Sequence, residues 1–290
     1  MPYPALLNDL SILRLVQIAL NEDIGDGDVT SESLLPPETY GQAVMLAKAE
    51  GVVAGTAIAD LAFREVDGDV TCDWMMEDGA RVAPGSVIGH IRGPVRSIII
   101  GERTALNFMQ RMSGVATLTR RFVDAIAGTG ATILDTRKTI PGWRLLDKYA
   151  VAAGGGKNHR MGLYDMVMIK DNHIEAYGSI TGAVQAASAW LGERGLQERI
   201  PIEVETRNLD EVREALKLPA VARIMFDNFT LEMMRQGAAL VDGAKETEAS
   251  GDVTLENVRQ VAETGVQFIS SGALTHSAKA LNISLEIMRQ

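Results

Sequence analysis

The chain has 290 residues, of which 46% are hydrophobic and 23% are charged, and it carries a formal net charge of −10. This balance is typical of a globular protein with apolar material for one large domain or two ordinary ones, and it excludes a disordered chain. The acidic surface argues against nucleic acid and anionic membranes as partners, and the single cysteine, Cys72, excludes an intrachain disulfide framework.

The first part of the chain predicts a helix followed by short strands. Apolar residues recur at helical spacing in residues 10–20. The acidic, glycine-rich residues 22–30 lack the spacing of a calcium-binding loop, and we interpret them as a turn with helix-capping side chains. Residues 43–100 show short β-type runs broken by turns, and residues 102–112 indicate a helix. Cys72 lies in one of these runs, where we expect it to serve packing rather than nucleophilic chemistry.

Beyond residue 115, short apolar strands alternate with helical segments, which indicates βα units and a mainly parallel sheet. The predicted strands are residues 131–134, 166–169, 201–204, 222–226, 243–247 and 266–269. The predicted helices are residues 143–153, 180–193, 209–216, 231–240 and 255–263. Six such repeats favour a complete or incomplete (β/α) barrel. A dinucleotide-binding fold fits less well, because the glycine-rich residues 128–133 precede a strand and lack the third glycine.

Polar residues follow every predicted strand, at the end where a (β/α) barrel collects its chemistry. They occupy residues 135–139, 170–173, 205–207, 227–228, 250–251 and 271–272. Singly, each group is equally compatible with a solvated turn or a helix cap. Their joint register with the strand ends favours a functional site.

The polar residues also separate by charge. Cations stand at Arg137, Lys138 and Lys170, and the loop 157–160 adds His159 and Arg160. In a chain of net charge −10, this cluster suits a compact dianion or a phosphate-rich ligand, since guanidinium groups bind carboxylates with two hydrogen bonds.

Later strand ends supply a different chemistry. Glu205 and Asp227 are two carboxylates suited to magnesium or to ribose hydroxyls. Ser250-Gly251 and Ser271-Gly272 leave room for backbone N–H groups to approach a phosphate. Together with the cations, these residues predict a site for a small polyanion and a metal-assisted sugar phosphate.

Six segments in series carry a family resemblance: residues 22–30, 135–139, 157–160, 170–173, 203–205 and 271–276. They resemble the quinolinate phosphoribosyltransferase family, also called carboxylating nicotinate-nucleotide pyrophosphorylases, in order from about residue 10 to the C-terminus. The resemblance implies an α/β protein with an N-terminal α/β sandwich domain (residues 1–115) and a C-terminal open (β/α) barrel with fewer than eight strands (residues 116–277). For residues 278–290 we expect a helix that packs back on the N-terminal domain.

The resemblance also implies an activity. A member of this family transfers the 5-phosphoribosyl group of phosphoribosyl pyrophosphate to quinolinate with decarboxylation. The products are nicotinate mononucleotide, pyrophosphate and CO2, in de novo NAD biosynthesis, with Mg2+ as cofactor. It further implies a homodimer, with or without higher assembly, in which the N-terminal domain of each subunit covers the barrel mouth of the other. No apolar run is long enough to span a bilayer and residues 1–9 carry no basic leader, so we expect a cytoplasmic protein.

Residue roles follow from the same resemblance. Arg103 would reach into the partner's site, and the quinolinate pocket would be completed by Arg137, Lys138, His159, Arg160 and Lys170. Glu205 and Asp227 would serve Mg2+ and the ribose. The phosphate end would be lined by Ser250, Gly251, Ser271 and Gly272. The candidate catalytic residues are Lys138, Lys170, Glu205 and Asp227.

Two alternatives remain at this stage. The chain could be a phosphoribosyltransferase-like enzyme of the same superfamily with another substrate, or a non-catalytic barrel that binds a phosphate or a nucleotide. The density of carboxylate-binding cations favours a dicarboxylate substrate. Paired carboxylates in the same site as these cations favour catalysis over simple binding.

Overall fold

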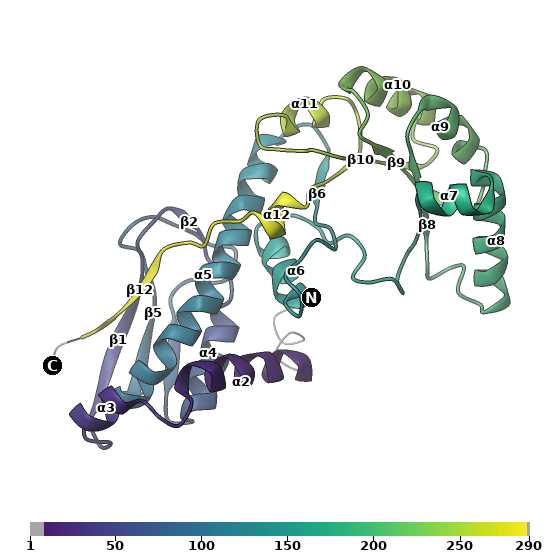
Figure 1. Cartoon of the computed structure of the whole chain (residues 1–290). Helices are drawn as coiled ribbons and strands as arrows, with labels where there is room; N and C mark the ends of the chain where they lie inside the picture. Colours follow the sequence, from purple (N-terminus) through teal and green to yellow (C-terminus); the bar gives the residue numbers. More distant parts are fainter. Residues whose placement is uncertain (1–8, 289–290) are drawn as a thin grey trace. The chain divides into compact units, whose positions relative to one another are not determined.

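The computed structural model describes residues 9–288 and groups them into two compact units (Figure 1). Unit 1 holds residues 9–120, 140–155 and 278–288, and unit 2 holds residues 121–139 and 156–277. The predicted boundary at residue 115 falls inside a 31-residue helix, α5 (Val95–Ala125). Residues 1–8, which include most of the segment that we examined for a leader, lie outside the described residues, as do residues 289–290.

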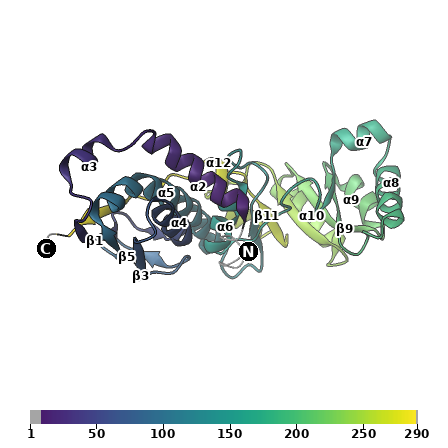
Figure 2. The same cartoon turned by 90° about the horizontal axis from the view of Figure 1, so that it is seen from below.

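Unit 1 contains a four-stranded antiparallel sheet in the order β12-β1-β5-β3. Its strands are β1 (Tyr40–Ala47), β3 (Thr71–Trp74), β5 (Val87–Pro94) and β12 (Ile283–Ile287). Helices α2 (Leu10–Ile24), α4 (Thr56–Val66) and α5 lie on the same side of this sheet (Figure 2). The predicted N-terminal helix is confirmed as α2, which buries Ile12, Val16 and Leu20, at the spacing of one helix face. A shorter helix, α6 (Arg144–Ala153), also belongs to unit 1.

The acidic segment 22–30 has the predicted capping role. Gly25 ends α2 with a φ of 54°, a left-handed conformation that glycine adopts without steric cost. Asp28 then caps α3 (Val29–Leu34), because its carboxylate accepts hydrogen bonds from the backbone N–H groups of Thr30 and Ser31, both at 3.0 Å. This segment therefore joins two helices.

Two predictions for unit 1 were wrong. Residues 283–287 form strand β12 rather than a helix, and they pair with β1 with Ile283 opposite Ala47. Ile283 and Leu285 are buried every second residue, which suits a strand against one sheet face. Residues 43–100 include helix α4 as well as strands: the small, two-stranded pair β2 (Gly51–Val52) and β4 (Arg81–Val82) flanks it.

Unit 2 contains a six-stranded parallel sheet in the order β6-β11-β10-β9-β8-β7. The strands are β6 (Thr132–Leu134), β7 (Val167–Ile169), β8 (Ile202–Thr206), β9 (Val221–Asp227), β10 (Glu246–Ser250) and β11 (Phe268–Ser270). The helices are α7 (Asp171–Tyr177), α8 (Ile180–Glu193), α9 (Leu209–Leu216), α10 (Leu231–Val241), α11 (Val258–Ala262) and α12 (Ala273–His276). The first and last strands of the order, β6 and β7, are not paired with each other, so this is an open barrel-like sheet with fewer than eight strands, as predicted.

The order of the strands determines on which face of the parallel sheet the helices lie. Strands β7 to β11 follow one another in sequence, and right-handed crossovers that always step in one direction put every connecting helix on the same face. Helices α8, α9 and α10 accordingly lie along the outer side of the curved sheet (Figure 1). The inner face is left for side chains that alternate along each strand.

The predicted strand 243–247 lies three residues too early, since β10 runs from Glu246 to Ser250. Its inward side chains include Glu248, which is fully buried. A charged residue in the strand interior conceals the apolar pattern by which a buried parallel strand is usually recognised. In the part of the chain that the structure describes, no helix has both the length and the apolar character needed to cross a bilayer.

Candidate active site

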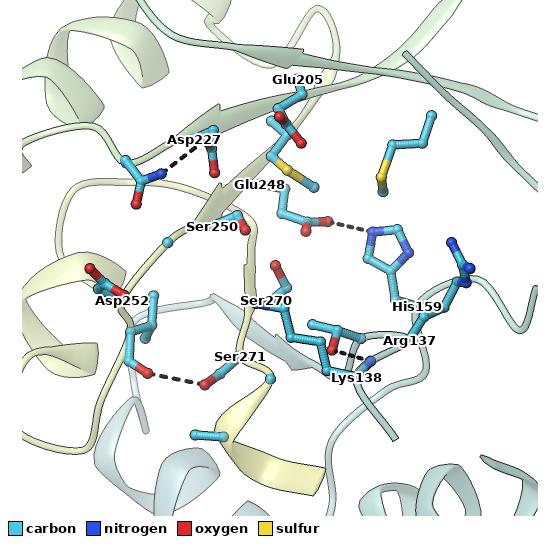
Figure 3. Close-up of a pocket in the computed structure, with 18 of the residues that line it drawn as sticks. Arg137, Lys138, His159, Glu205, Asp227, Glu248, Ser250, Asp252, Ser270 and Ser271 are labelled. Carbon is cyan, nitrogen blue, oxygen red and sulfur yellow. Dashed lines mark hydrogen bonds and ion pairs between the residues drawn. The ribbon is translucent and has the colours of Figure 1, made fainter. Parts of the chain in front are cut away.

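The carboxyl ends of the six parallel strands surround one cavity of about 760 Å³ within unit 2 (Figure 3). Eleven of the predicted site residues line it: Arg137, Lys138, His159, Arg160, Lys170, Glu205, Asp227, Ser250, Gly251, Ser271 and Gly272. The twelfth, Arg103, is exposed on α5 in unit 1. The cavity also contains residues that were not predicted, among them Met168, Met225, Asn228, Glu248, Asp252, Ser270 and His276.

The cationic part of the cavity consists of two chain segments joined by a buried carboxylate. Asp135, fully buried at the end of β6, accepts a hydrogen bond from the backbone N–H of His159 at 2.8 Å. Its own backbone N–H donates to the carbonyl of Lys157 at 3.2 Å. The segment with Arg137 and Lys138 is thereby fixed against the segment with His159 and Arg160. Sequence reasoning gave Asp135 no role, although a carboxylate directly after a buried strand was a signal for one.

The pKa of Arg160 reflects the positive charges that lie close together on this side of the cavity. Burial, and next the charge of Arg137, lower the pKa of Arg160 below its usual range. The Arg160 side chain is held by a hydrogen bond from Nη1 to the carbonyl of Met166 at 3.3 Å. Two guanidinium groups at close range repel each other, so an anion between them would relieve the repulsion and bind strongly.

The two predicted metal ligands are already partnered within the protein. Glu205 is largely buried and forms an ion pair with Lys170. Asp227 accepts a hydrogen bond from Nδ2 of Asn228 at 2.9 Å. Each carboxylate keeps oxygen atoms that face the cavity, where Figure 3 shows both side chains on the side away from Arg137 and Lys138.

Left-handed backbone shapes the edge of the cavity between β9 and β10. Gly251 has a φ of 103°, and a Cβ atom placed on it would lie 2.1 Å from Oδ1 of Asn228. Asn228 and Asp252 also have positive φ values, of 54° and 47°. Such conformations are costly outside glycine and persist where the surrounding structure requires them. Here Gly251 brings bare backbone to the edge of the cavity, as a phosphate site needs.

Ser271 lines the cavity, and its own hydrogen-bond donors are engaged within the protein. Its backbone N–H donates to the carbonyl of Leu134 at 3.1 Å, and its hydroxyl donates to the carbonyl of Val253 at 3.0 Å. Both donors are therefore used to join β11 to its neighbours. The backbone at Gly272 lies close to the Lys138 side chain, because a Cβ atom placed on Gly272 would be 2.7 Å from that side chain. The small residue leaves room for that lysine.

A buried charged network lies beneath the cavity, and sequence reasoning missed it. Nε2 of His159 is 3.2 Å from a carboxylate oxygen of Glu203 and 3.2 Å from one of Glu248. Both glutamates are fully buried. Nη1 of Arg223 lies 3.0 Å from the same oxygen of Glu248 that faces His159. The signal was present: alternate residues of β8, β9 and β10 carry charge within otherwise apolar strands.

The two carboxylates of this network differ in proton affinity. Burial, and next the repulsion from Glu248, raise the pKa of Glu203. Burial acts on Glu248 in the same direction, but hydrogen bonding to His159 and the charge of Arg223 outweigh it, and the pKa of Glu248 is lowered. Desolvation opposes ionisation of His159, yet its bonds to Glu203 and Glu248 prevail and raise the pKa to about 9.

Fold and site together define a class: an open parallel barrel whose mouth gathers cations on one side, carboxylates on another and a glycine-lined backbone edge between them. Such a site suits an enzyme that brings an anionic acceptor to a sugar phosphate.

Comparison with known proteins identifies the family. Residues 28–113 match the quinolinate phosphoribosyl transferase N-terminal domain, and residues 115–286 match the C-terminal domain. Quinolinate phosphoribosyltransferase [decarboxylating] 1b of Nicotiana tabacum is 49% identical over 94% of this chain and 81% of its own length. A probable nicotinate-nucleotide pyrophosphorylase [carboxylating] of Bacillus subtilis is 43% identical over 97% and 95% of the two chains. The crystal structure of NadC from Streptococcus pyogenes superposes with a TM-score of 0.91 at 35% identity, over 97% and 98%. The chain belongs to the quinolinate phosphoribosyltransferase family.

Proposed function

We propose that the unit 2 cavity is where this chain carries out the reaction of its family. As a family member the chain is a pentosyltransferase. It transfers the 5-phosphoribosyl group of phosphoribosyl pyrophosphate to quinolinate, with loss of CO2, in NAD biosynthesis. The observation that carries the placement is one cavity, lined also by Arg160, that has Arg137 and Lys138 on one side and Glu205 and Asp227 on another.

The cationic side would bind quinolinate. Its two carboxylates match the guanidinium groups of Arg137 and Arg160, which are close enough to lower the pKa of Arg160. Lys138 adds a third cation next to Arg137. Held in this way, the ring nitrogen would point toward the sugar, and the fixed geometry would supply a large part of the rate enhancement.

The opposite side would bind phosphoribosyl pyrophosphate. Glu205 and Asp227 fit Mg2+ as it is usually bound in proteins, by one or two carboxylates with substrate phosphates completing its shell. When bound, Mg2+ would neutralise charge on the departing pyrophosphate. The Gly251 edge would hold the phosphate groups, and Lys170, paired with Glu205, would orient that carboxylate.

The chemical steps need no covalent intermediate with the protein. The ring nitrogen forms a bond to the anomeric carbon as the bond to pyrophosphate breaks. The resulting positive ring accepts the electron pair left when the bond to the adjacent carboxylate breaks, and CO2 leaves. A proton from solvent then completes the ring carbon. Cations around the carboxylates would hold them through both steps.

Assembly and location form part of the same proposal. The predicted homodimer would place Arg103 of the partner subunit at the quinolinate side, and the expected compartment is the cytoplasm. Both rest on the resemblance and on composition, and neither alters the assignment of residues within unit 2.

Product analysis tests the function against its alternatives. Purified protein with phosphoribosyl pyrophosphate and Mg2+ is offered quinolinate, nicotinate or phthalate, and nucleotides are identified by mass spectrometry. We expect nicotinate mononucleotide from quinolinate alone. Nucleotide from nicotinate but not from quinolinate would contradict the proposed acceptor, and tight binding of quinolinate without product would favour a non-catalytic barrel.

A further inference from the structure

Apart from His159, the residues of the buried charged network have no part in the roles given above. Arg223 lies over the ring of Phe268 at 4.1 Å and contacts Glu246 at 2.8 Å and Glu248 at 3.0 Å. Glu248 in turn contacts His159, which also contacts Glu203. A continuous path of charged contacts thus runs from the interior of the sheet to Glu248 and His159, which both line the cavity.

Stability is a poor explanation for this path. The interior of a parallel barrel is usually filled by branched aliphatic side chains. Taking charges out of water costs more than their attraction returns in many cases, and apolar replacements of similar volume are often as stable or more so. Glu203 and Glu248 are fully buried, so their desolvation is complete. A buried ionic network that does not serve stability is expected to specify one arrangement of the groups that it contacts.

The group at its end is the ring of His159. The backbone N–H of Arg160 donates to Nδ1 at 2.7 Å, which favours the neutral ring, whereas the carboxylates favour the charged one. Nε2 of His159 lies between the two carboxylates, 3.2 Å from an oxygen of each, so their negative charge attracts this edge of the ring. Glu203 and Glu248 therefore hold the ring on its Nε2 side, and on its Nδ1 side the ring contacts the backbone of Arg160.

A metal ion is a less suitable explanation for the same residues. Ligand atoms of His159, Glu203 and Glu248 lie within 4.8 Å of one another. However, Arg223 already supplies a positive charge 3.0 Å from Glu248, at the oxygen that also faces His159. A second cation there would meet its repulsion.

We propose that Glu248, held by Arg223, is a positioning residue that orients His159 and, through it, Arg160 for binding the dicarboxylate acceptor. This inference rests on the proposed function. It predicts an effect confined to quinolinate, because Glu248 contacts His159, whereas Gly251 and Asp227 both adjoin Asn228.

The chain offers a matched control for a test. Glu246 and Glu248 lie on the same strand, face the same arginine and are two residues apart, but only Glu248 reaches His159. Glu248→Met and Glu246→Met are therefore compared, with the isosteric Glu248→Gln as a third variant that keeps an oxygen acceptor. Steady-state KM values are measured for quinolinate and for phosphoribosyl pyrophosphate, and folding is checked by thermal unfolding.

For Glu248→Met we expect the KM for quinolinate to rise about tenfold or more, with the KM for phosphoribosyl pyrophosphate changed less than about twofold. Glu248→Gln, which keeps an oxygen acceptor but loses the charge, should show an intermediate rise of about threefold for quinolinate, and Glu246→Met should resemble the wild type. Equal KM changes for both substrates, or equal behaviour of the two methionine variants, would overturn the inference.

If Glu248→Met does not fold, Glu248→Gln decides by the same criterion: a rise of about threefold for quinolinate alone supports the inference, and wild-type values overturn it. The wild type serves as the reference for the proposed function. Its failure to turn over quinolinate would reject that function, whereas an active wild type with no selective effect at Glu248 rejects only the positioning role.

Discussion

The side chains at the mouth of the unit 2 cavity follow the ends of strands, and buried partners hold the segments that carry these side chains. Arg137 and Lys138 follow β6, and Asp135 beneath them binds the neighbouring segment through the backbone of His159. Substitution of a residue at the cavity mouth should therefore reduce function alone. Substitution of a buried partner should also disturb the fold.

Arg137 belongs to the first kind. We expect Arg137→Ala to lower kcat/KM for quinolinate by about 100-fold or more, since it removes a two-bond carboxylate partner from a water-poor site. Arg213→Ala is the matched control, because Arg213 is an exposed arginine on α9 whose ion pair with Asp210 contributes little. Turnover assays with circular dichroism check both variants. An Arg137→Ala enzyme with near-normal kcat/KM would contradict the assignment.

Substitution of Gly251 tests whether the backbone edge of the cavity binds phosphoribosyl pyrophosphate. We expect Gly251→Ala to abolish binding of phosphoribosyl pyrophosphate, because the added Cβ would lie 2.1 Å from Asn228. Gly243→Ala provides the comparison: Gly243 also has a positive φ, of 73°, but has open space around it. Gly243→Ala should lose about 1 kcal/mol of unfolding free energy from backbone strain, Gly251→Ala should lose more because of the added clash with Asn228, and only Gly251→Ala should lose the ligand, as calorimetry would show.

Local sequence could reveal the residues at the strand ends but not those beneath them. Polar residues directly after apolar runs mark the mouth of a parallel barrel, so Arg137, Lys170 and Asp227 were predictable. Glu248 stands inside its strand, where alternating charge indicates a buried charged residue but not its partners, because Arg223 and His159 come from another strand and a loop. Only the register of β9 with β10 brings them together.

At the scale of whole elements, the sheets depend on pairings between distant segments. The β7-to-β11 order follows from repeated βα units and could be predicted from their alternation. Strand β12 could not, since the residues it contains have apolar side chains at both helical and strand spacing. Its pairing with β1, some 240 residues earlier in the chain, decides the outcome.

The register of strand β12 can be tested through the alternation of buried and exposed side chains along it. Ile283 is 2% exposed and faces the core of unit 1, whereas the Glu286 side chain is 51% exposed and pairs with Lys48. We expect Ile283→Ala to cost about 2–4 kcal/mol of unfolding free energy and Glu286→Ala about 0.5 kcal/mol or less, by urea denaturation. Equal costs would argue against this register.

At the scale of the whole molecule, the buried charges should make stability depend on pH. The pKa of His159 is raised from 6.5 to about 9 on folding. A group whose pKa is higher in the folded state contributes stability that is fully present below the unfolded value and is lost as pH rises through the folded value. We therefore expect the stability difference between wild type and His159→Gln to be largest near pH 6 and to shrink toward pH 9, by urea unfolding at several pH values. A difference that grows with pH would contradict this sign.

Assembly is also tested at this scale. If the site is shared, Arg103→Ala and Arg137→Ala subunits are each inactive alone, but a mixed dimer holds one site with both arginines intact. Random reassociation of equal amounts should then recover about one quarter of wild-type activity. No recovery, with exchange of subunits verified by mass, would show that each site is contained in one subunit.

The most direct test of the central claim is the stoichiometry of the reaction. Quinolinate labelled in the carboxyl group next to the ring nitrogen is incubated with the protein, phosphoribosyl pyrophosphate and Mg2+, and released CO2 and pyrophosphate are counted together. We predict equal amounts of both, with release that requires every component. Pyrophosphate without CO2, or CO2 without the sugar phosphate, would contradict phosphoribosyl transfer coupled to decarboxylation in this cavity.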